Sequence, residues 1–148
     1  MNPMAMTGLA RTMGAARAMR ITETDTNYFV ILFDPETDGF SHICVIEIFE
    51  QGGATPPNSH SRAHEFFYVL SGEGRAELEG QEQNIAKGDA LLLPPGVEHV
   101  IENTGPGKLY TLTVMFPNEG FAELIRGGIP VELDEEDMKI LTDMRSGE

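Results

Sequence analysis

The sequence contains one cysteine, no tryptophan and few basic residues. With Cys44 alone, the chain cannot form an intramolecular disulfide, and its position in the apolar run HICVIEIF favours a small buried hydrophobe over a reactive thiol. No apolar run approaches the roughly 18 residues that a membrane-spanning helix needs. We therefore expect a cytoplasmic protein that folds without disulfides and has no membrane partner.

Acidic residues outnumber basic ones by 24 to 10, which gives a formal net charge of −14. Phosphate backbones and anionic lipid surfaces would repel such a chain, so we expect no nucleic-acid partner and favour a small-molecule ligand. The sequence has no phosphate-binding glycine loop, nucleophile elbow or paired-cysteine metal site. Residues 1–20 contain no acid and are predicted to form a flexible arm.

Beyond this arm, apolar and polar residues alternate in short segments separated by glycine, proline and aspartate. No helical pattern connects these segments, so they predict seven or eight antiparallel strands in a sandwich, jelly roll or small barrel. An exposed strand edge near residues 28–33 would suit pairing between subunits. The predicted strands lie within residues 27–33, 41–50, 64–72, 74–80, 82–88, 89–96, 97–103 and 109–117.

The chain changes character after Pro117. Asn118 is predicted to cap a helix that ends at Gly127, and a second short helix is predicted to begin at Asp134. One face of the first helix carries Phe121, Leu124 and Ile125. The predicted organisation is thus an arm over residues 1–20, a barrel over 21–117 and a helical tail over 118–148 that packs on the barrel.

Four polar residues are candidates for one site. In an extended segment Asn58 and His60 face the same way, whereas Glu65 reaches their side only if SRAH contains a turn or bulge. His64 then points away from Glu65. His99 follows the rigid PPG corner much later in the chain. Two histidines and one carboxylate meeting inside a barrel would bind Fe(II) or a related divalent ion and leave positions open for substrate or oxygen.

Two spaced motifs contain these residues. They are Gly52-x5-Asn58-x-His60-x4-Glu65-x6-Gly72 and Gly88-x5-Pro94-x-Gly96-x2-His99-x3-Asn103, separated by 15 residues. From about residue 40 to 116 the chain resembles the cupin superfamily, in particular its small single-domain members. Nine of the ten fixed positions match, and Asn58 stands where the family usually has histidine.

The resemblance implies a double-stranded β-helix, the cupin barrel, often found as a homodimer. It also implies one divalent metal ion (Fe, Mn, Ni or Zn) held by His60, Glu65 and His99. Three roles remain open for Asn58. It is a ligand through its amide oxygen, a hydrogen-bond partner of a metal-bound water or substrate, or only a turn residue after two prolines.

The segment FPNEGFAELI resembles the tail of quercetin-dioxygenase-like cupins, where a helix lies near the barrel mouth. Its apolar face would then form a lid; the other placement packs the helix on the outside of the sheet or across a dimer. The predicted substrate-binding residues are Tyr68, Phe67 and Phe121.

Three charged residues are secondary candidates for the pocket. Arg62 and Arg75 are the nearest basic residues that could bind an anionic substrate. Glu47 lies within an apolar strand, and an inward-facing acid there is the less favoured placement.

These features predict a metal-binding cupin that acts on a small oxygen-donor molecule inside the barrel. An iron site would suit a dioxygenase-type reaction, and manganese, nickel or zinc would suit an isomerase or lyase. Residues that act on the substrate beyond the metal ligands are not identified. The alternative is a non-catalytic small-molecule-binding cupin whose metal site is weakened or lost.

Overall fold

The computed structural model describes residues 8–15 and 17–142. The strands are β1 (Ala18–Arg20), β2 (Asn27–Phe33), β3 (Ile43–Phe49), β4 (His64–Ser71), β5 (Glu73–Leu78), β6 (Gln81–Ala86), β7 (Ala90–Leu93), β8 (His99–Asn103), β9 (Leu109–Phe116) and β10 (Ile129–Val131). The helices are α1 (Pro35–Asp38), α2 (Phe121–Arg126) and α3 (Glu135–Leu141), and a 3₁₀ turn spans Met13–Ala15.

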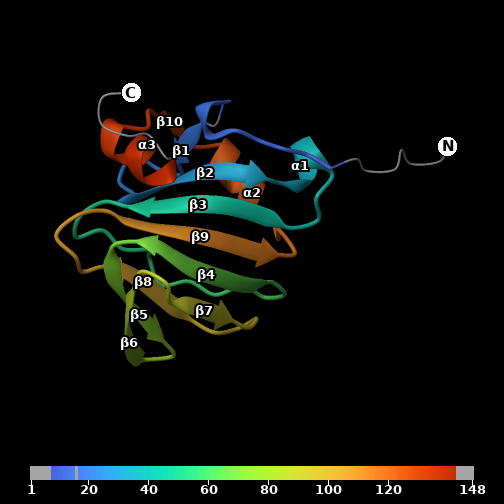
Figure 1. Cartoon of the computed structure of the whole chain (residues 1–148). Coiled ribbons are helices and arrows are strands. Elements are labelled where there is room, and N and C mark those ends of the chain that lie inside the picture. Colours follow the sequence, from blue (N-terminus) through green and yellow to red (C-terminus); the bar gives the residue numbers. More distant parts are fainter. Residues whose placement is uncertain (1–7, 16, 143–148) are drawn as a thin grey trace.

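The strands form two antiparallel sheets. Seven strands follow the order β10-β1-β2-β3-β9-β4-β7, and three follow the order β6-β5-β8 (Figure 1). The prediction of an all-β jelly-roll barrel is confirmed. Its physical basis is the alternation in strands such as β4, whose odd-numbered residues from Glu65 to Val69 are buried while the residues between them are more exposed.

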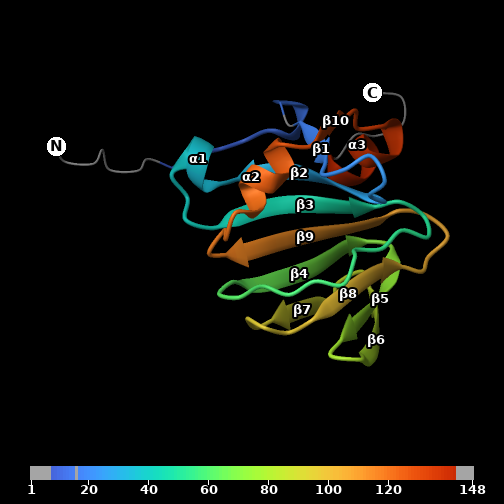
Figure 2. The same ribbon diagram turned by 180° about the vertical axis from the view of Figure 1, so that it is seen from behind.

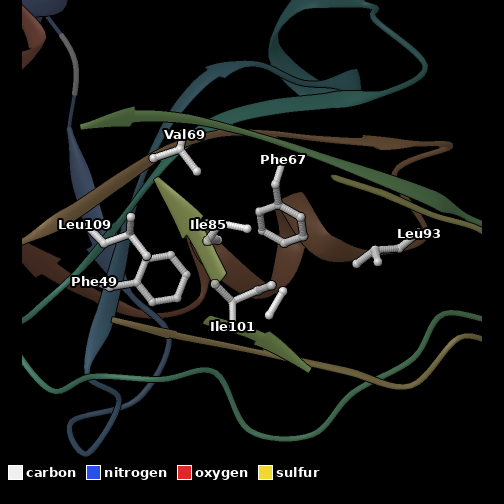
Figure 3. Close-up of a cluster of buried hydrophobic side chains, with 8 residues drawn as sticks. Phe49, Phe67, Val69, Ile85, Leu93, Ile101 and Leu109 are labelled. Carbon is white, nitrogen blue, oxygen red and sulfur yellow. The ribbon is translucent and has the colours of Figure 1, made fainter. Parts of the chain in front are cut away.

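An apolar core fills the space between the two sheets (Figure 3). Phe67 and Val69 come from β4 and Ile101 from β8, so the larger sheet packs directly against the smaller one. The complete cluster is Phe49, Phe67, Val69, Ala76, Ile85, Leu93, Ile101 and Leu109. This cluster occupies one part of the barrel interior and leaves the region around Glu65 for polar residues.

The helix α2 lies against the face of the larger sheet that is toward the viewer in Figure 2. Ala122 and Ile125 are fully buried there, and the ring of Phe121 meets that of Phe29 edge to face with centroids 5.4 Å apart. The apolar spacing of FAELIR explains this placement, because it leaves one helical face for the sheet. Gly120 caps the helix rather than Asn118, but the Oδ1 of Asn118 still accepts a hydrogen bond of 2.8 Å from the N–H of Ala122.

The helix α3 is held on the opposite face by a buried acid. Asp137, 1% exposed, accepts hydrogen bonds of 2.7 Å from both Tyr28 and Tyr110. The Nζ of Lys108 lies 3.1 Å from the same carboxylate, and Asp134 closes a capping box at the helix start. A tail residue is thereby tied to β2 and β9, which makes residues 135–141 part of the folded domain.

Two predictions about the N-terminal part are wrong. Residues 18–20, placed in a flexible arm, form β1, which pairs with β2 and β10; residues 1–7 and 16 of that arm lie outside the described residues. Because β1 covers β2 through the pairs Ala18–Val30 and Met19–Phe29, β2 is not an edge strand. The homodimer stays a prediction. No helix of the described ranges is long and apolar enough to cross a membrane.

The core between the sheets predicts that truncating one of its side chains destabilises the protein. Replacing Ile101, which is 0% exposed, by alanine removes three methyl or methylene groups from a packed site. We expect the free energy of unfolding to fall by about 2–5 kcal/mol in urea denaturation. Leu92→Ala is the control, because this side chain is 58% exposed and the expected change is within about 0.5 kcal/mol. Equal losses for the two variants would contradict this description of the core.

Candidate metal centre

The three polar residues reach the site from separate parts of the chain. Glu65 is the second residue of β4, His99 is the first residue of β8, and His60 lies in the connection before β4. Gly96 has a φ of 85°, a conformation that glycine adopts at little cost, and its N–H donates a 2.8 Å hydrogen bond to the carbonyl of His60. The corner that begins His99's strand is thus fastened to the loop that carries His60.

A second pair of main-chain hydrogen bonds joins the same two segments. The N–H of Asn58 donates to the carbonyl of His99 at 3.2 Å, and the N–H of His99 donates to the carbonyl of Asn58 at 2.9 Å. Asn58 therefore sits in a β-bridge opposite His99. This pairing aligns the first motif with the second and brings residues about forty positions apart to one place.

The side chains of His60, Glu65 and His99 offer three ligand atoms that all lie within 4.8 Å of one another. The Nε2 of His99 is 2.9 Å from Oε1 of Glu65, and the Nε2 of His60 is 3.6 Å from the same oxygen. Neither approach is a hydrogen bond, so Oε1 of Glu65 and Nε2 of His60 are buried without a partner among the described residues. Such orphaned atoms are uncommon in folded proteins.

The charges in the cluster support one another. Burial, the largest effect, would raise the pKa of Glu65, but His60 and His99 together lower it. Burial would likewise lower the pKa of His99, whereas Glu65 and the carbonyl of Val97 raise it. The carboxylate is therefore held in its charged form, as metal binding requires.

This donor set fits a divalent metal ion. The Nδ1 of His99 lies 3.1 Å from the carbonyl of Val97, so a proton on Nδ1 can be donated there and the lone pair of Nε2 would be available to a metal ion. A carboxylate oxygen and two imidazole nitrogens face one another, and a metal ion would replace the proton that Glu65 favours on His99. A cation among them would satisfy all three, and this combination of nitrogen and oxygen ligands suits Fe, Mn, Ni or Zn.

A cavity of about 410 Å³ opens beside the cluster. Its wall has an apolar part contributed by β2, β4 and α2 and a polar part around the two histidines. Phe121 and Leu124 place α2 on this wall, while Ile125, the third residue of the predicted lid face, is buried against the sheet. The lining residues are Ile21, Thr22, Asp25, Asn27, Phe29, Glu47, Thr55, Pro56, Asn58, His60, Glu65, Phe67, His99, Phe121 and Leu124.

Glu47 is an inward acid, contrary to the favoured placement. It is 3% exposed and lines the cavity, with Asn27 donating to Oε2 at 2.8 Å. Burial, reinforced by the charge of Glu65, raises its pKa to about 8. The hydroxyl of Thr113 donates to Oε1 of Glu47 at 3.2 Å and lies 2.9 Å from the hydroxyl of Thr111. Its sequence signal was the inward parity that it shares with Val45 and Phe49 on β3.

Two of the three predicted substrate-binding residues line the cavity, and the third does not. Phe67 and Phe121 line the cavity, and their role toward a substrate stays a prediction. The assignment of Tyr68 is wrong, because its side chain follows Phe67 on β4, faces the opposite side and is 38% exposed. His64 shares that outer side, where its ring stacks on Phe116 at 5.3 Å.

The two arginines do not belong to the cavity wall. Arg62 has a side chain 76% exposed beside Glu119, and Arg75 pairs with Glu102 at 2.7 Å on the smaller sheet. Asn58 does line the cavity beside His60. It occupies a β-bridge rather than a simple turn, and a role toward a metal stays a prediction.

The chain is similar to known proteins in sequence and fold. A family model described as a cupin domain matches residues 45–115. An uncharacterised protein of Methanocaldococcus jannaschii is 33% identical over 66 residues, which cover 45% of this chain and 53% of that protein. A germin-like protein of rice is 37% identical over 68 residues, covering 43% of this chain and 31% of the relative. The chain thus matches about half or less of these curated relatives.

Solved structures share the fold at lower sequence identity. A protein of Thermotoga maritima, described as a predicted oxalate decarboxylase, superposes with a TM-score of 0.64 at 23% identity. The match covers 72% of this chain and 97% of that one. At this identity the likeness shows the fold alone.

The buried state of Glu47 predicts a pH dependence of stability in the metal-free protein. Its pKa rises from 4.5 to about 8 on folding, so the folded state keeps a proton that the unfolded state loses. The contribution is therefore complete below about pH 4.5 and is lost as pH rises toward 8. Relative to Glu47→Gln, the wild-type free energy of unfolding should fall by about 1.4 kcal/mol per pH unit in this window.

Urea denaturation at several pH values measures this difference. The exposed Glu98→Gln is the control and should leave the pH profile of the wild type unchanged. Parallel profiles for wild type and Glu47→Gln would mean that Glu47 is ionised in the folded protein.

Proposed function

Because this chain belongs to the cupin superfamily, we propose that it is a metal-dependent enzyme acting on a small, largely apolar oxygen-donor molecule. The observation that carries the proposal is the cluster of His60, Glu65 and His99, whose ligand atoms lie within 4.8 Å of one another beside the cavity. Its unpartnered Nε2 and Oε1 atoms support a metal ligand set over a self-contained polar core.

Two histidines and one carboxylate would hold the ion and leave coordination positions for substrate. When bound, a divalent ion supplies Lewis-acid polarisation of an oxygen donor, and iron adds redox chemistry with O₂. The open positions support a dioxygenase-type reaction. A neutral Glu47 on the same wall supports an isomerase or lyase instead, since it can hold or release a proton near the substrate.

The cavity wall supports the apolar character of the ligand. Phe29, Phe67 and Phe121 present aromatic surface, and Ile21 and Leu124 add aliphatic surface. A ligand with an apolar body would bury it against these side chains, and its oxygen would reach the polar end near Glu65. Glu65 leaves a divalent ion with a net charge of about +1, which suits an enolisable carbonyl compound.

A second candidate is a non-catalytic binding protein with a weakened metal site. Asn58 favours this alternative, because an amide oxygen is a weaker ligand than imidazole for borderline metals. Such a protein would keep the same cavity and bind its ligand without turnover.

Metal content separates the two candidates. Plasma mass spectrometry on untagged wild-type protein should find near-stoichiometric divalent metal, and His60→Ala/His99→Ala should lose it because two of the three ligands are gone. His64→Ala is the matched control, since this histidine stacks on the outer side of the sheet. Iron would direct assays to dioxygenase activity, and manganese, nickel or zinc to isomerase and lyase activity. Wild-type protein that stays empty after reconstitution would overturn the enzyme proposal.

The ligand class has its own test. Calorimetry on the metal-loaded protein should show tighter binding of acetylacetone, an uncharged enolisable diketone, than of malonate, with metal retention verified afterwards. Leu124→Ala should weaken diketone binding about fivefold by removing apolar contact worth about 1 kcal/mol. Leu92→Ala is the control outside the cavity. Preference for malonate would contradict an apolar ligand.

A further inference from the structure

Glu119 occupies an unusual place between β9 and α2. Its φ of 51° lies in the left-handed region, which a residue with a side chain adopts at a cost, and Gly120 follows with a φ of 83°. A glycine would relieve that cost at position 119. Hydrogen bonds to the Glu119 carboxylate therefore have to offset the cost of this backbone conformation.

The carboxylate binds the turn that directly follows His60. Oε1 accepts hydrogen bonds from the N–H of Arg62 at 2.6 Å and the hydroxyl of Ser61 at 3.1 Å, and Oε2 accepts from the N–H of Ser61 at 3.2 Å. Burial would raise the pKa of Glu119, but these donors outweigh it and lower the pKa. The side chain thus works as a charged cap on residues 61–62.

The same carboxylate faces the Nδ1 side of the His60 ring, away from Glu65. Oε2 of Glu119 lies 3.8 Å from Nδ1 of His60, while Nε2 of that ring points toward Glu65. If Nε2 binds a metal, Nδ1 carries the ring proton, and a nearby carboxylate fixes that tautomer and the ring orientation. The separation exceeds a direct hydrogen bond, so the attraction in this conformation is electrostatic.

On its other side Glu119 continues into the helix that lines the cavity. Asn118 holds the start of α2 through Ala122 and through a 2.8 Å hydrogen bond from its Nδ2 to Glu123. Phe121, two residues after Glu119, contributes to the cavity wall. Glu119 is therefore the connection between α2 and the loop of His60.

We propose that Glu119 is a positioning residue of the metal centre, which orients His60 and couples it to the α2 wall of the cavity. The inference rests on the proposed metal-binding function. Since coupling between sites is reciprocal, metal binding and the docking of α2 stabilise each other. Glu119 touches neither the cavity nor the three ligand atoms, so its effect on a metal passes through His60.

The test measures Zn(II) affinity by competition with a chelating dye and the visible absorption of the Co(II)-loaded protein. Glu119→Gln keeps the size of the side chain and one acceptor oxygen but removes its charge, and the Kd should rise about tenfold with an altered Co(II) spectrum. Glu119→Gly relieves the left-handed backbone and deletes the carboxylate, and it should weaken binding at least as much. Arg62→Ala is the matched control, because it leaves the main-chain donor in place and should stay within about twofold.

The outcomes distinguish a failure of the proposed metal binding from a failure of the positioning role of Glu119. If wild-type protein binds Zn(II) but Glu119→Gln and Glu119→Gly bind it equally well with an unchanged Co(II) spectrum, Glu119 is only a turn residue and the inference is overturned. If wild-type protein binds no metal, the proposed function fails and the inference falls with it. Weakened affinity and an altered spectrum in both variants, with Arg62→Ala unaffected, support the positioning role.

Discussion

The burial of a carboxylate between two histidines is the constraint on which this structure depends. Glu65 sits 4% exposed in a barrel whose other part is filled by aromatic and aliphatic side chains. A charge in such a place is costly unless other groups compensate it. His60 and His99 supply that compensation, and the hydrogen bonds around Asn58 and Gly96 hold their segments together. The same arrangement leaves unpartnered nitrogen and oxygen atoms directed at one point, which is what a metal ion needs.

Two buried acids in one cavity have opposite character because their neighbours differ. Glu65 lies between imidazoles and is held charged, whereas Glu47 is surrounded by amide and hydroxyl groups and by the charge of Glu65. Two adjacent carboxylates disfavour double ionisation, so one of them keeps its proton. Glu65 thus provides a charged group in the candidate metal centre, and Glu47 provides a neutral acid on the wall of the same cavity.

The tail completes the domain from both faces of the larger sheet. α3 is anchored through Asp137 on the outer side, while α2 packs on the inner side and brings Phe121 to the cavity. Neither helix is long enough to be stable alone, so both depend on these contacts. The segment between β9 and α2 is the most consequential of them, because Glu119 contacts the loop of a candidate ligand while its chain continues into the cavity wall.

The sequence by itself determined the barrel and the candidate ligands, since alternation with a period of two specifies which strand face is buried and the resemblance of the two motifs to those of cupins implies which residues meet. Parity also placed His64 outside, and the same rule assigns Tyr68 to the outer face. Tertiary structure alone decided the pairing of β1 with β2, because three residues carry too little alternation to predict a strand. It also decided the protonation state of Glu47 and the contacts of Glu119 with residues 61–62. Both depend on partners that are distant in the sequence and are brought close only by folding.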